Sequence, residues 1–95
     1  MYSSISAIDL KGLIGRVKII DIRDNYLYRL GWIPTATNVP NNFLITNPTN
    51  YLDKETTYYI YCTCGITSAK TCSVLSSQGY KVINVTGGYN DYISK

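Results

Sequence analysis

The sequence predicts an α/β protein in which helices flank a central, mostly parallel sheet. Short apolar runs typical of buried strands alternate along the chain with segments of helical pattern, and the links between them are short. Hydrophobic residues make up 45% of the chain and charged residues only 16%, a composition that favours a packed core over disorder. The 95 residues suffice for one domain, which we expect over residues 1–95.

The first half of the chain is expected to hold two short helices and two strands. Each helix has an N-capping side chain at its start and a glycine at its end. The predicted helices are residues 6–14, between Ser6 and Gly15, and residues 24–30, between Asp24 and Gly31. The predicted strands are the apolar run 17–21 and the shorter segment 36–39, which precedes Pro40.

The second half is expected to add two strands and a longer helix. Residues 41–56 are rich in Asn, Thr and Pro, which indicates a loop with one or two helical turns. The predicted strands are 58–61 and 82–85, and the predicted helices are 68–77 and a last turn over 89–93 after Gly87 and Gly88. The side chains expected to pack from helix 68–77 are those of Ala69, Cys72, Val74 and Leu75.

Charge, hydropathy and the missing histidine exclude several classes of function. The formal charge is +3, but the nine Lys and Arg residues form no basic stripe, so we expect no nucleic-acid partner. No apolar stretch approaches the ~18 residues of a membrane span, and the first residues do not resemble a signal peptide. We therefore expect no membrane association and a cytoplasmic protein, which an odd number of cysteines, three, also fits. Without histidine, Ser-His-Asp catalysis, Cys-His catalysis and histidine metal sites are excluded.

The segment from Cys62 to Ser68 carries the chemistry that the sequence predicts. It joins a predicted strand to a predicted helix, where the N–H groups of a tight loop point inward and the helix N-terminus adds positive potential. A cysteine placed first in such a cradle has its thiolate stabilised without a histidine. Gly65 lets the backbone bend, and the small side chains of Thr63, Thr67 and Ser68 are expected to keep the mouth open and add hydroxyl donors. The alternative is that Cys62 is a buried structural thiol at a strand end.

Four motifs in order resemble those of the rhodanese-like domain family. Residues 61–69 read Tyr-Cys-Thr-Cys-Gly-Ile-Thr-Ser-Ala, similar to the family's active-site loop Tyr-Cys-x-x-Gly-x-Arg-Ser-x. Residues 19–23 resemble its Asp-x-Arg strand end, residues 31–40 its Gly-His-Ile-Pro-Gly-Ala-x-Asn-x-Pro stretch, and residues 85–89 its Gly-Gly turn. Each motif alone is weak, but the shared order and spacing cover nearly the whole chain.

The resemblance implies a rhodanese-like three-layer fold and a sulfurtransferase activity. Cys62 is then the sulfur acceptor, which takes sulfane sulfur from a small sulfur-containing anion or a persulfide donor and passes it to a thiol or cyanide acceptor. No cofactor and no metal are expected, and a protein partner in a sulfur relay is compatible with this role. The residues that the resemblance assigns to holding the persulfide and the donor are Thr63, Cys64, Gly65, Ile66, Thr67 and Ser68.

The chain departs from the family pattern at two positions. Thr67 replaces the loop arginine, which offers a fixed fork of donors to an oxyanion, so thiosulfate turnover is expected to be weak. Trp32 replaces the family histidine and is interpreted as a packing residue. Asp21 and Arg23 are expected to be structural and to hydrogen-bond loops beneath the site.

The two other cysteines have different predicted roles. Cys64 is either a bystander that faces away from the cradle or a second thiol that attacks a persulfide on Cys62. A direct disulfide between these two would span one intervening residue and would be strained. Cys72 is expected to belong to the core. A zinc site built from the three cysteines would lack the fourth ligand that a structural zinc site needs.

Two further functions compete with sulfur transfer. The first is a non-enzymatic rhodanese-fold module that binds a partner or senses sulfide or oxidants, which the missing arginine favours. The second is a phosphatase or arsenate reductase, which needs Cys-x5-Arg. Six positions after Cys62 stands Ser68, and six after Cys64 stands Lys70, so neither cysteine fits that motif. The loop from Cys62 to Thr67 also has the six-residue length associated with sulfurtransferases, one residue shorter than phosphatase-type loops.

Overall fold

The computed structural model describes residues 2–94, so Met1 and Lys95, the ends of the predicted domain, lie outside the described residues. Its strands form one parallel five-stranded sheet in the order β1-β5-β4-β2-β3. The strands are β1 (Ser3–Ser6), β2 (Lys18–Asp21), β3 (Thr37–Asn38), β4 (Thr57–Tyr61) and β5 (Lys81–Thr86). The α-helices are α1 (Ala7–Leu10), α2 (Asn25–Leu30), α3 (Asn41–Thr46), α4 (Ile66–Ser77) and α5 (Gly88–Ser94). Short 3-10 helices follow α1 (Lys11–Leu13) and α3 (Pro48–Asn50).

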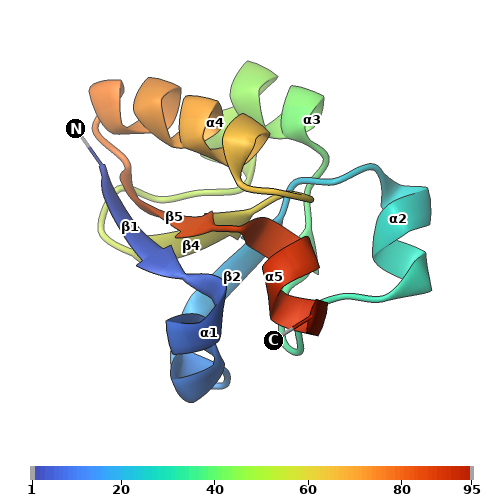
Figure 1. The fold of residues 1–95 in the computed structure, drawn as a ribbon. Helices are drawn as coiled ribbons and strands as arrows, with labels where there is room; N and C mark the ends of the chain where they lie inside the picture. Colours follow the sequence, from blue (N-terminus) through green and yellow to red (C-terminus); the bar gives the residue numbers. More distant parts are fainter. Residues whose placement is uncertain (1, 95) are drawn as a thin grey trace.

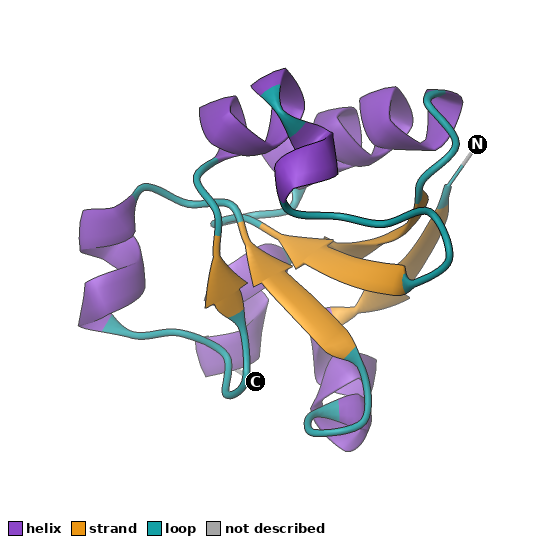
Figure 2. Ribbon diagram, turned by 180° about the vertical axis from the view of Figure 1, so that it is seen from behind, coloured by secondary structure: helices purple, strands orange, loops and turns teal. Residues whose placement is uncertain are grey.

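The helices lie on both faces of the sheet, which gives three layers. Helices α3 and α4 cover one face, and α1 and α5 cover the other (Figure 1). Helix α2 lies to one side of the sheet, as the view from behind also shows (Figure 2). The α/β fold with a parallel sheet predicted from the sequence is therefore confirmed.

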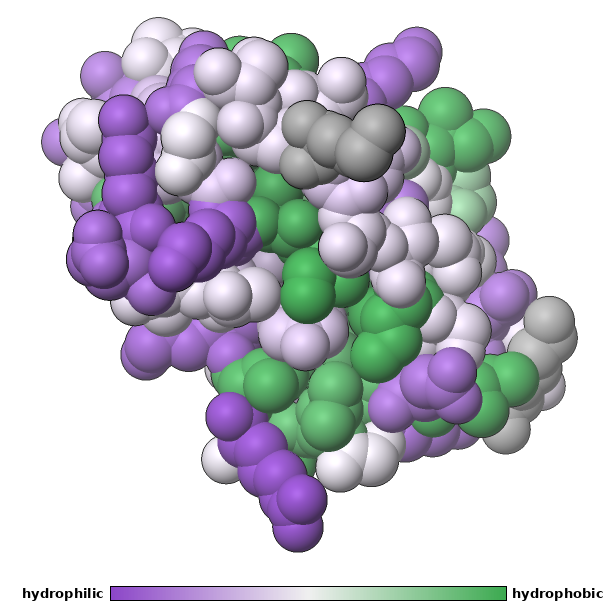
Figure 3. Space-filling view, turned by 90° about the vertical axis from the view of Figure 1, so that its left-hand side faces the viewer, coloured by the Kyte–Doolittle hydropathy of each residue, from purple (hydrophilic) through white to green (hydrophobic). Residues whose placement is uncertain are grey.

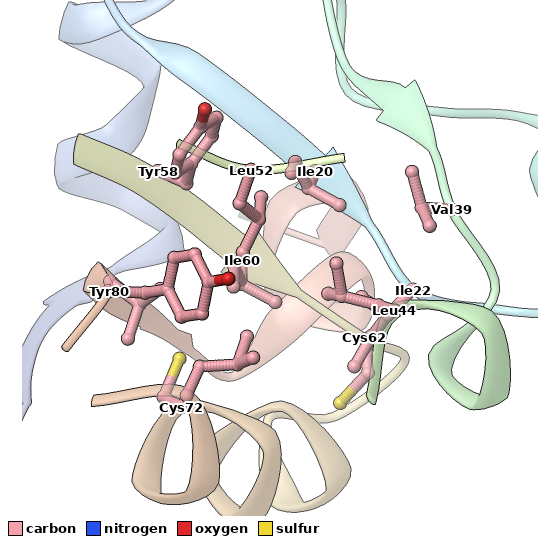
Figure 4. Packing of buried hydrophobic residues seen from close by; sticks show 12 residues of the cluster. Ile20, Ile22, Val39, Leu44, Leu52, Tyr58, Ile60, Cys62, Cys72 and Tyr80 are labelled. Carbon is pink, nitrogen blue, oxygen red and sulfur yellow. The ribbon is translucent and has the colours of Figure 1, made fainter. Parts of the chain in front are cut away.

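The alternation of side chains along the central strand β4 divides the core between the two faces. Ile60 belongs to the apolar cluster beneath α3 and α4, and Tyr61 belongs to the cluster beneath α1 and α5. Cys62, one residue further, returns to the first face and joins the cluster that contains Leu44 and Cys72 (Figure 4). The period of two thus places the cysteine beside the first turns of α4.

One helix begins earlier than predicted, and one of the two predicted capping hydrogen bonds is not formed. Ser6 caps α1 as predicted, because its Oγ accepts a hydrogen bond from the N–H of Asp9 at 3.0 Å. Asp24 occupies the N-cap position of α2, but its carboxylate makes no capping hydrogen bond, so the predicted role of this side chain is wrong. Helix α4 begins at Ile66, two residues earlier than predicted, because the left-handed backbone of Gly65 turns the chain directly into it.

Two features of the packing were not predicted. Strand β1 consists largely of serine, and it forms because it pairs in parallel with β5, where Ser3 faces Ile83 and Ser6 faces Thr86 in register. It is the edge strand on the left of Figure 1, and the surface on that side shows apolar groups interrupted by polar ones (Figure 3). Val74 was expected in the core but is 39% exposed, and Thr71 is buried on α4 instead.

No helix within residues 2–94 has the length and apolar character needed to cross a membrane. Because every strand runs in the same direction, the carboxyl ends of the strands meet at one edge of the sheet. In sheets of this kind that edge is where ligands bind. Cys62 directly follows β4, the middle strand, at this edge.

Candidate functional site

The loop between β4 and α4 bends at Gly65. This residue has a φ of +96°, in the left-handed region that favours glycine. A Cβ atom there would also lie 2.9 Å from the backbone nitrogen of Gly87, in the turn after β5. Gly65 is therefore required both by its own conformation and by the close approach of a second turn.

The sulfur of Cys62 accepts hydrogen bonds from the backbone of this loop. The N–H of Gly65 donates to Sγ at 3.1 Å, and the N–H of Ser68 donates at 3.3 Å. The side chain points toward the layer that contains α4 (Figure 4) and is only 6% exposed. Two N–H dipoles, one from the loop and one from the first turn of a 12-residue helix, thus meet at one sulfur atom.

These contacts make Cys62 the more acidic of the two buried thiols. Burial alone would raise the pKa of Cys62, but hydrogen bonds from the side chain of Ser68 and from the N–H groups of Ser68, Gly65 and Cys64 outweigh it and lower the pKa. Cys72 has burial without such donors and feels the charge of Cys62, so its pKa is raised to about 12. The loop therefore favours a thiolate at Cys62 and a thiol at Cys72.

Buried polar side chains complete the surroundings of the sulfur. Ser68 Oγ lies 3.3 Å from Cys62 Sγ and 2.6 Å from Oδ1 of Asn84. Nδ2 of Asn84 in turn lies 3.5 Å from the carbonyl oxygen of Gly65. Ser68 is fully buried and Asn84 is 3% exposed. Sulfur, hydroxyl, amide and loop backbone thus form a closed hydrogen-bonded ring.

The start of α5 holds the loop from its other side. The N–H of Tyr89 donates to the carbonyl of Cys62, and the N–H of Asn90 donates to that of Thr63, both at 2.9 Å. A Cβ atom on Gly88 would clash with the carbonyl oxygen of Cys62, so only glycine allows this approach. These bonds hold the loop in the conformation in which the N–H groups of Gly65 and Ser68 reach the sulfur.

The seven residues predicted for the site divide into two groups. Cys62, Gly65 and Ser68 come together at the sulfur through the hydrogen bonds above. The side chains of the others are exposed at the rim, with Ile66 at 65%; they belong to Thr63, Cys64, Ile66 and Thr67. The expectation that the Ser68 hydroxyl lines the mouth is wrong, because this hydroxyl is buried and faces Asn84.

Asn84 is the residue at the site that the sequence interpretation missed. It stands in β5, within the predicted strand 82–85, in which no residue was expected to belong to the site. A polar side chain inside a buried strand needs a hydrogen-bond partner. An asparagine among the apolar residues of a predicted strand was therefore the sequence signal that could have indicated a polar contact at this position. Its partners become visible only when β5 is placed beside β4 and beneath α4.

A buried ion pair supports the strand ends beneath the site, as expected for Asp21 and Arg23. The guanidinium Nη2 of Arg23 lies 2.8 Å from Oδ2 of Asp21 and donates to the carbonyl of Gly31 at 2.6 Å. The hydroxyl of Tyr61 donates to the same carboxylate at 2.6 Å and accepts the N–H of Ile33 at 3.1 Å. This network ties the loop after α2 to β2 and β4.

The network is closed by an aromatic ring from α5. The guanidinium carbon of Arg23 lies 4.1 Å from the ring centroid of Tyr89. Burial alone would lower the pKa of Arg23, but the hydrogen bonds and charge of Asp21 raise it. Burial, and next the hydrogen bond to Asp21, raise the pKa of the Tyr61 hydroxyl. The guanidinium therefore stays charged and the phenol stays protonated, so both remain hydrogen-bond donors.

The structure also has two further thiols and a groove beside the Cys62 loop that Gly65 and Asn84 help to line. All three cysteines are free; Cys72 is buried, as predicted, and Cys64 is exposed in a shallow groove of about 540 Å³ beside Lys70. A hollow of about 620 Å³ lies near the opposite ends of the strands, where it is lined by Lys18, the first residue of β2, and Tyr58, the second residue of β4. Its position at the amino ends of the strands separates it from the chemistry at Cys62.

Comparison with known proteins gives the same answer by sequence and by shape. The family model described as a rhodanese-like domain matches residues 6–95. The chain is 34% identical over 70 residues to YtwF of Bacillus subtilis, a protein provisionally named as a sulfurtransferase; the match covers 74% of this chain and 67% of that protein.

Solved structures of similar size superpose on the whole molecule. The crystal structure of SSP1007 from Staphylococcus saprophyticus has a TM-score of 0.87 at 34% identity, covering 95% of this chain and 92% of that one. That of a rhodanese-like domain protein from Staphylococcus aureus has a TM-score of 0.86 at 32% identity, covering 95% and 90%.

Proposed function

Because this chain belongs to the rhodanese-like family, a family of sulfurtransferases, we propose that it moves sulfane sulfur to a thiophilic acceptor through a persulfide on Cys62. The observation that carries the proposal is the convergence of the Gly65 and Ser68 N–H groups on Sγ, which favours a thiolate in a chain without histidine. The proposed donor is a persulfide or a small sulfur-containing anion, and the proposed acceptor is a thiol or cyanide.

The proposed reaction has two balanced steps. In loading, the Cys62 thiolate attacks the outer sulfur of a donor persulfide; a new S–S bond forms, the donor's S–S bond breaks, and its electron pair leaves on the donor thiolate. In transfer, an acceptor thiolate attacks the outer sulfur now on Cys62, and the electron pair of the broken bond returns to Sγ. Neither step requires a base, because the nucleophile in each is already a thiolate.

The rim of the loop favours a donor of low charge. Thr67, where the family has arginine, is exposed in the first turn of α4, and Ile66 beside it is exposed and apolar. Thiosulfate would leave sulfite as a dianion, which a guanidinium would stabilise and a threonine hydroxyl would not. We therefore propose that organic persulfides and polysulfides are better donors than thiosulfate.

The second candidate is a non-enzymatic rhodanese-fold module that binds a partner or senses sulfide or oxidants. The observations that favour it are the same Thr67 and the burial of Cys62, a residue that is only 6% exposed. In this case Cys62 would accept sulfur and hold it without passing it on. A thiol acceptor that removes the sulfur from loaded protein distinguishes a carrier from a sensor.

Intact mass spectrometry after incubation with glutathione persulfide, and separately with thiosulfate, tests the proposal. We expect the mass of one added sulfur with the persulfide, its loss on adding a thiol acceptor, and much less loading by thiosulfate. Cys62→Ser should abolish loading, while Cys64→Ser, its matched control from the same loop, should keep it. Equal loading of Cys62→Ser and wild type would refute the proposal, and loading without release would favour the sensor.

A further inference from the structure

Asn84 fixes the direction of the hydrogen bonds around Cys62. A backbone carbonyl oxygen only accepts hydrogen bonds, so the amide group of Asn84 that faces the Gly65 carbonyl must be the NH₂ group. The amide oxygen Oδ1 is then turned toward Ser68, at 2.6 Å from its hydroxyl oxygen. The loop backbone thus determines the orientation of the Asn84 side chain.

This orientation determines where the single hydroxyl hydrogen of Ser68 lies. Oδ1 of Asn84 only accepts, so the Ser68 hydroxyl donates to it and turns its lone pairs toward Cys62 Sγ, 3.3 Å away. A thiol or another uncharged sulfur fits this arrangement, because it does not need a hydrogen bond from the Ser68 hydroxyl. The S–H of a thiol can itself donate to Oγ of Ser68. A thiolate requires the other direction, in which the Ser68 hydroxyl turns from Asn84 and donates to the sulfur.

We propose that Asn84 is a positioning residue for the Ser68 hydroxyl. While Sγ of Cys62 is uncharged, as in the persulfide, Asn84 accepts the hydrogen bond of this hydroxyl and keeps its hydrogen away from the sulfur. When the Cys62 thiolate is regenerated, the hydroxyl leaves Asn84 and donates to the sulfur instead. The idea rests on the proposed role of Cys62 as the sulfur carrier. When the acceptor takes the outer sulfur, the electron pair of the broken S–S bond returns to Sγ, and the hydroxyl rotates from Asn84 to this new charge. The proton stays on Ser68 throughout.

Asn84 therefore makes the uncharged, loaded sulfur more favourable relative to the empty thiolate than Ser68 and the two backbone donors would without it. Ionisable side chains other than Cys62 also lie in this region. Cys72, on the same face of α4, remains a thiol, and Asp91, in the first turn of α5, lies beside Gly87. The other residues of the apolar cluster that contains Cys62 include Ile22 and Leu44.

The pH midpoint of Cys62 alkylation, followed by peptide mapping, tests this role. Asn84→Leu keeps the shape of the side chain but accepts no hydrogen bond, so the Ser68 hydroxyl turns to the sulfur. The midpoint should move to lower pH, by the equivalent of about a fivefold rise in the thiolate-to-thiol ratio, the effect of one ordinary hydrogen bond. Ser68→Ala should move the midpoint to higher pH. Ser77→Ala, at the other end of α4 where the hydroxyl bonds to the carbonyl of Val74, is the matched control and should not move it.

The double variant separates positioning from a general structural effect. If Asn84 acts through the hydroxyl, Asn84→Leu has no further effect in the Ser68→Ala background. An equal shift in both backgrounds, or a shift of Asn84→Leu to higher pH, would overturn the proposal. Loading of wild-type protein by glutathione persulfide is measured in parallel; its failure would remove the proposed function, whereas normal loading without this coupling would remove only the role of Asn84.

A second measurement needs no change at Asn84. In wild-type protein below the pKa of Cys62, the infrared S–H stretching band that disappears in Cys62→Ser should lie at the low frequency of a hydrogen-bonded thiol. In Ser68→Ala the band should return toward that of a free thiol. A Cys62 band with the same position in both proteins would show that the S–H does not donate to Ser68 and would contradict the proposed direction of the ring.

Discussion

Replacement of Tyr61 by phenylalanine tests the buried network without touching the sulfur. The hydroxyl of this fully buried side chain makes two hydrogen bonds, one donated to the carboxylate of Asp21 and one accepted from the N–H of Ile33. Tyr61→Phe removes both and leaves a buried N–H without its acceptor. The ring itself keeps its place, so the change isolates the polar contribution.

The expected loss can be estimated from these two contacts. A buried donor left unpaired costs about 1–3 kcal/mol, and a hydrogen bond to a charged group contributes about 1.5–3 kcal/mol. Asp21 keeps its ion pair with Arg23, so the loss of the hydrogen bond to its carboxylate should cost less than the upper end of that range. We expect a decrease of about 3 kcal/mol in the free energy of unfolding, which for a domain of this size lowers the melting temperature by roughly 12–24 °C.

Urea unfolding, followed by the fluorescence of Trp32, measures the change. The matched control is Tyr59→Phe, on the same strand but only half buried, which should stay within about 0.5 kcal/mol of wild type. A loss below about 1 kcal/mol for Tyr61→Phe, or one equal to that of the control, would refute the reasoning. Folded Tyr61→Phe should also keep the alkylation midpoint of Cys62, because the two side chains lie on opposite faces of the sheet.

Four further predictions concern the loop, its thiols and the start of α5. Thr67→Arg should raise thiosulfate:cyanide turnover by about 10- to 150-fold, which is the effect of one hydrogen bond to a charged group. The rate is measured with saturating cyanide. An unchanged rate would show that the loop cannot direct the guanidinium toward the donor. Limited iodoacetamide labelling near neutral pH should modify Cys62 long before Cys72, and peptide mapping that finds the reverse order would contradict the assigned pKa directions. Because the folded-state pKa of Cys62 is lowered and that of Cys72 is raised, these thiols should make stability rise with pH toward about 9 and fall above it, which urea titrations would detect. Gly88→Ala should destabilise the fold by about 2–4 kcal/mol through its left-handed backbone and the clash with the Cys62 carbonyl, and a loss below about 1 kcal/mol in urea would argue against this close packing.

Local patterns in the sequence were sufficient to predict the sheet and the loop. Apolar runs mark β2, β4 and β5, and the strand–Cys–Gly–helix order marks the loop around Cys62 and Gly65. These features depend on residues close together in the chain, so periodicity and turn chemistry reveal them. The resemblance to known motifs added the expected role of Cys62.

What could not be predicted depends on contacts between distant segments. Strand β1 is rich in serine and becomes a strand only because it pairs with β5. In this pairing Ser3 faces Ile83, about eighty residues further along the chain. Asn84 looks like one more residue of a core strand until Ser68 is placed above it. Val74 is exposed because α4 carries apolar residues on several sides, and only packing on the sheet selects Cys72 and Leu75 for burial.

The pairing of the first strand with the last has a consequence for synthesis on the ribosome. Residues 3–6 emerge early but find their partner only after residues 81–86 have left the exit tunnel. Until then β5, the neighbour of β4, is absent from the sheet, and Asn84 is absent from the hydrogen-bonded ring around Cys62. Contacts of such long range fold slowly and leave strand edges open to wrong partners. The hydrogen bonds around Cys62 are therefore completed only after β5 has been added. Until then Cys62 has the pKa of an ordinary thiol, and its pKa falls only when the loop is fully packed.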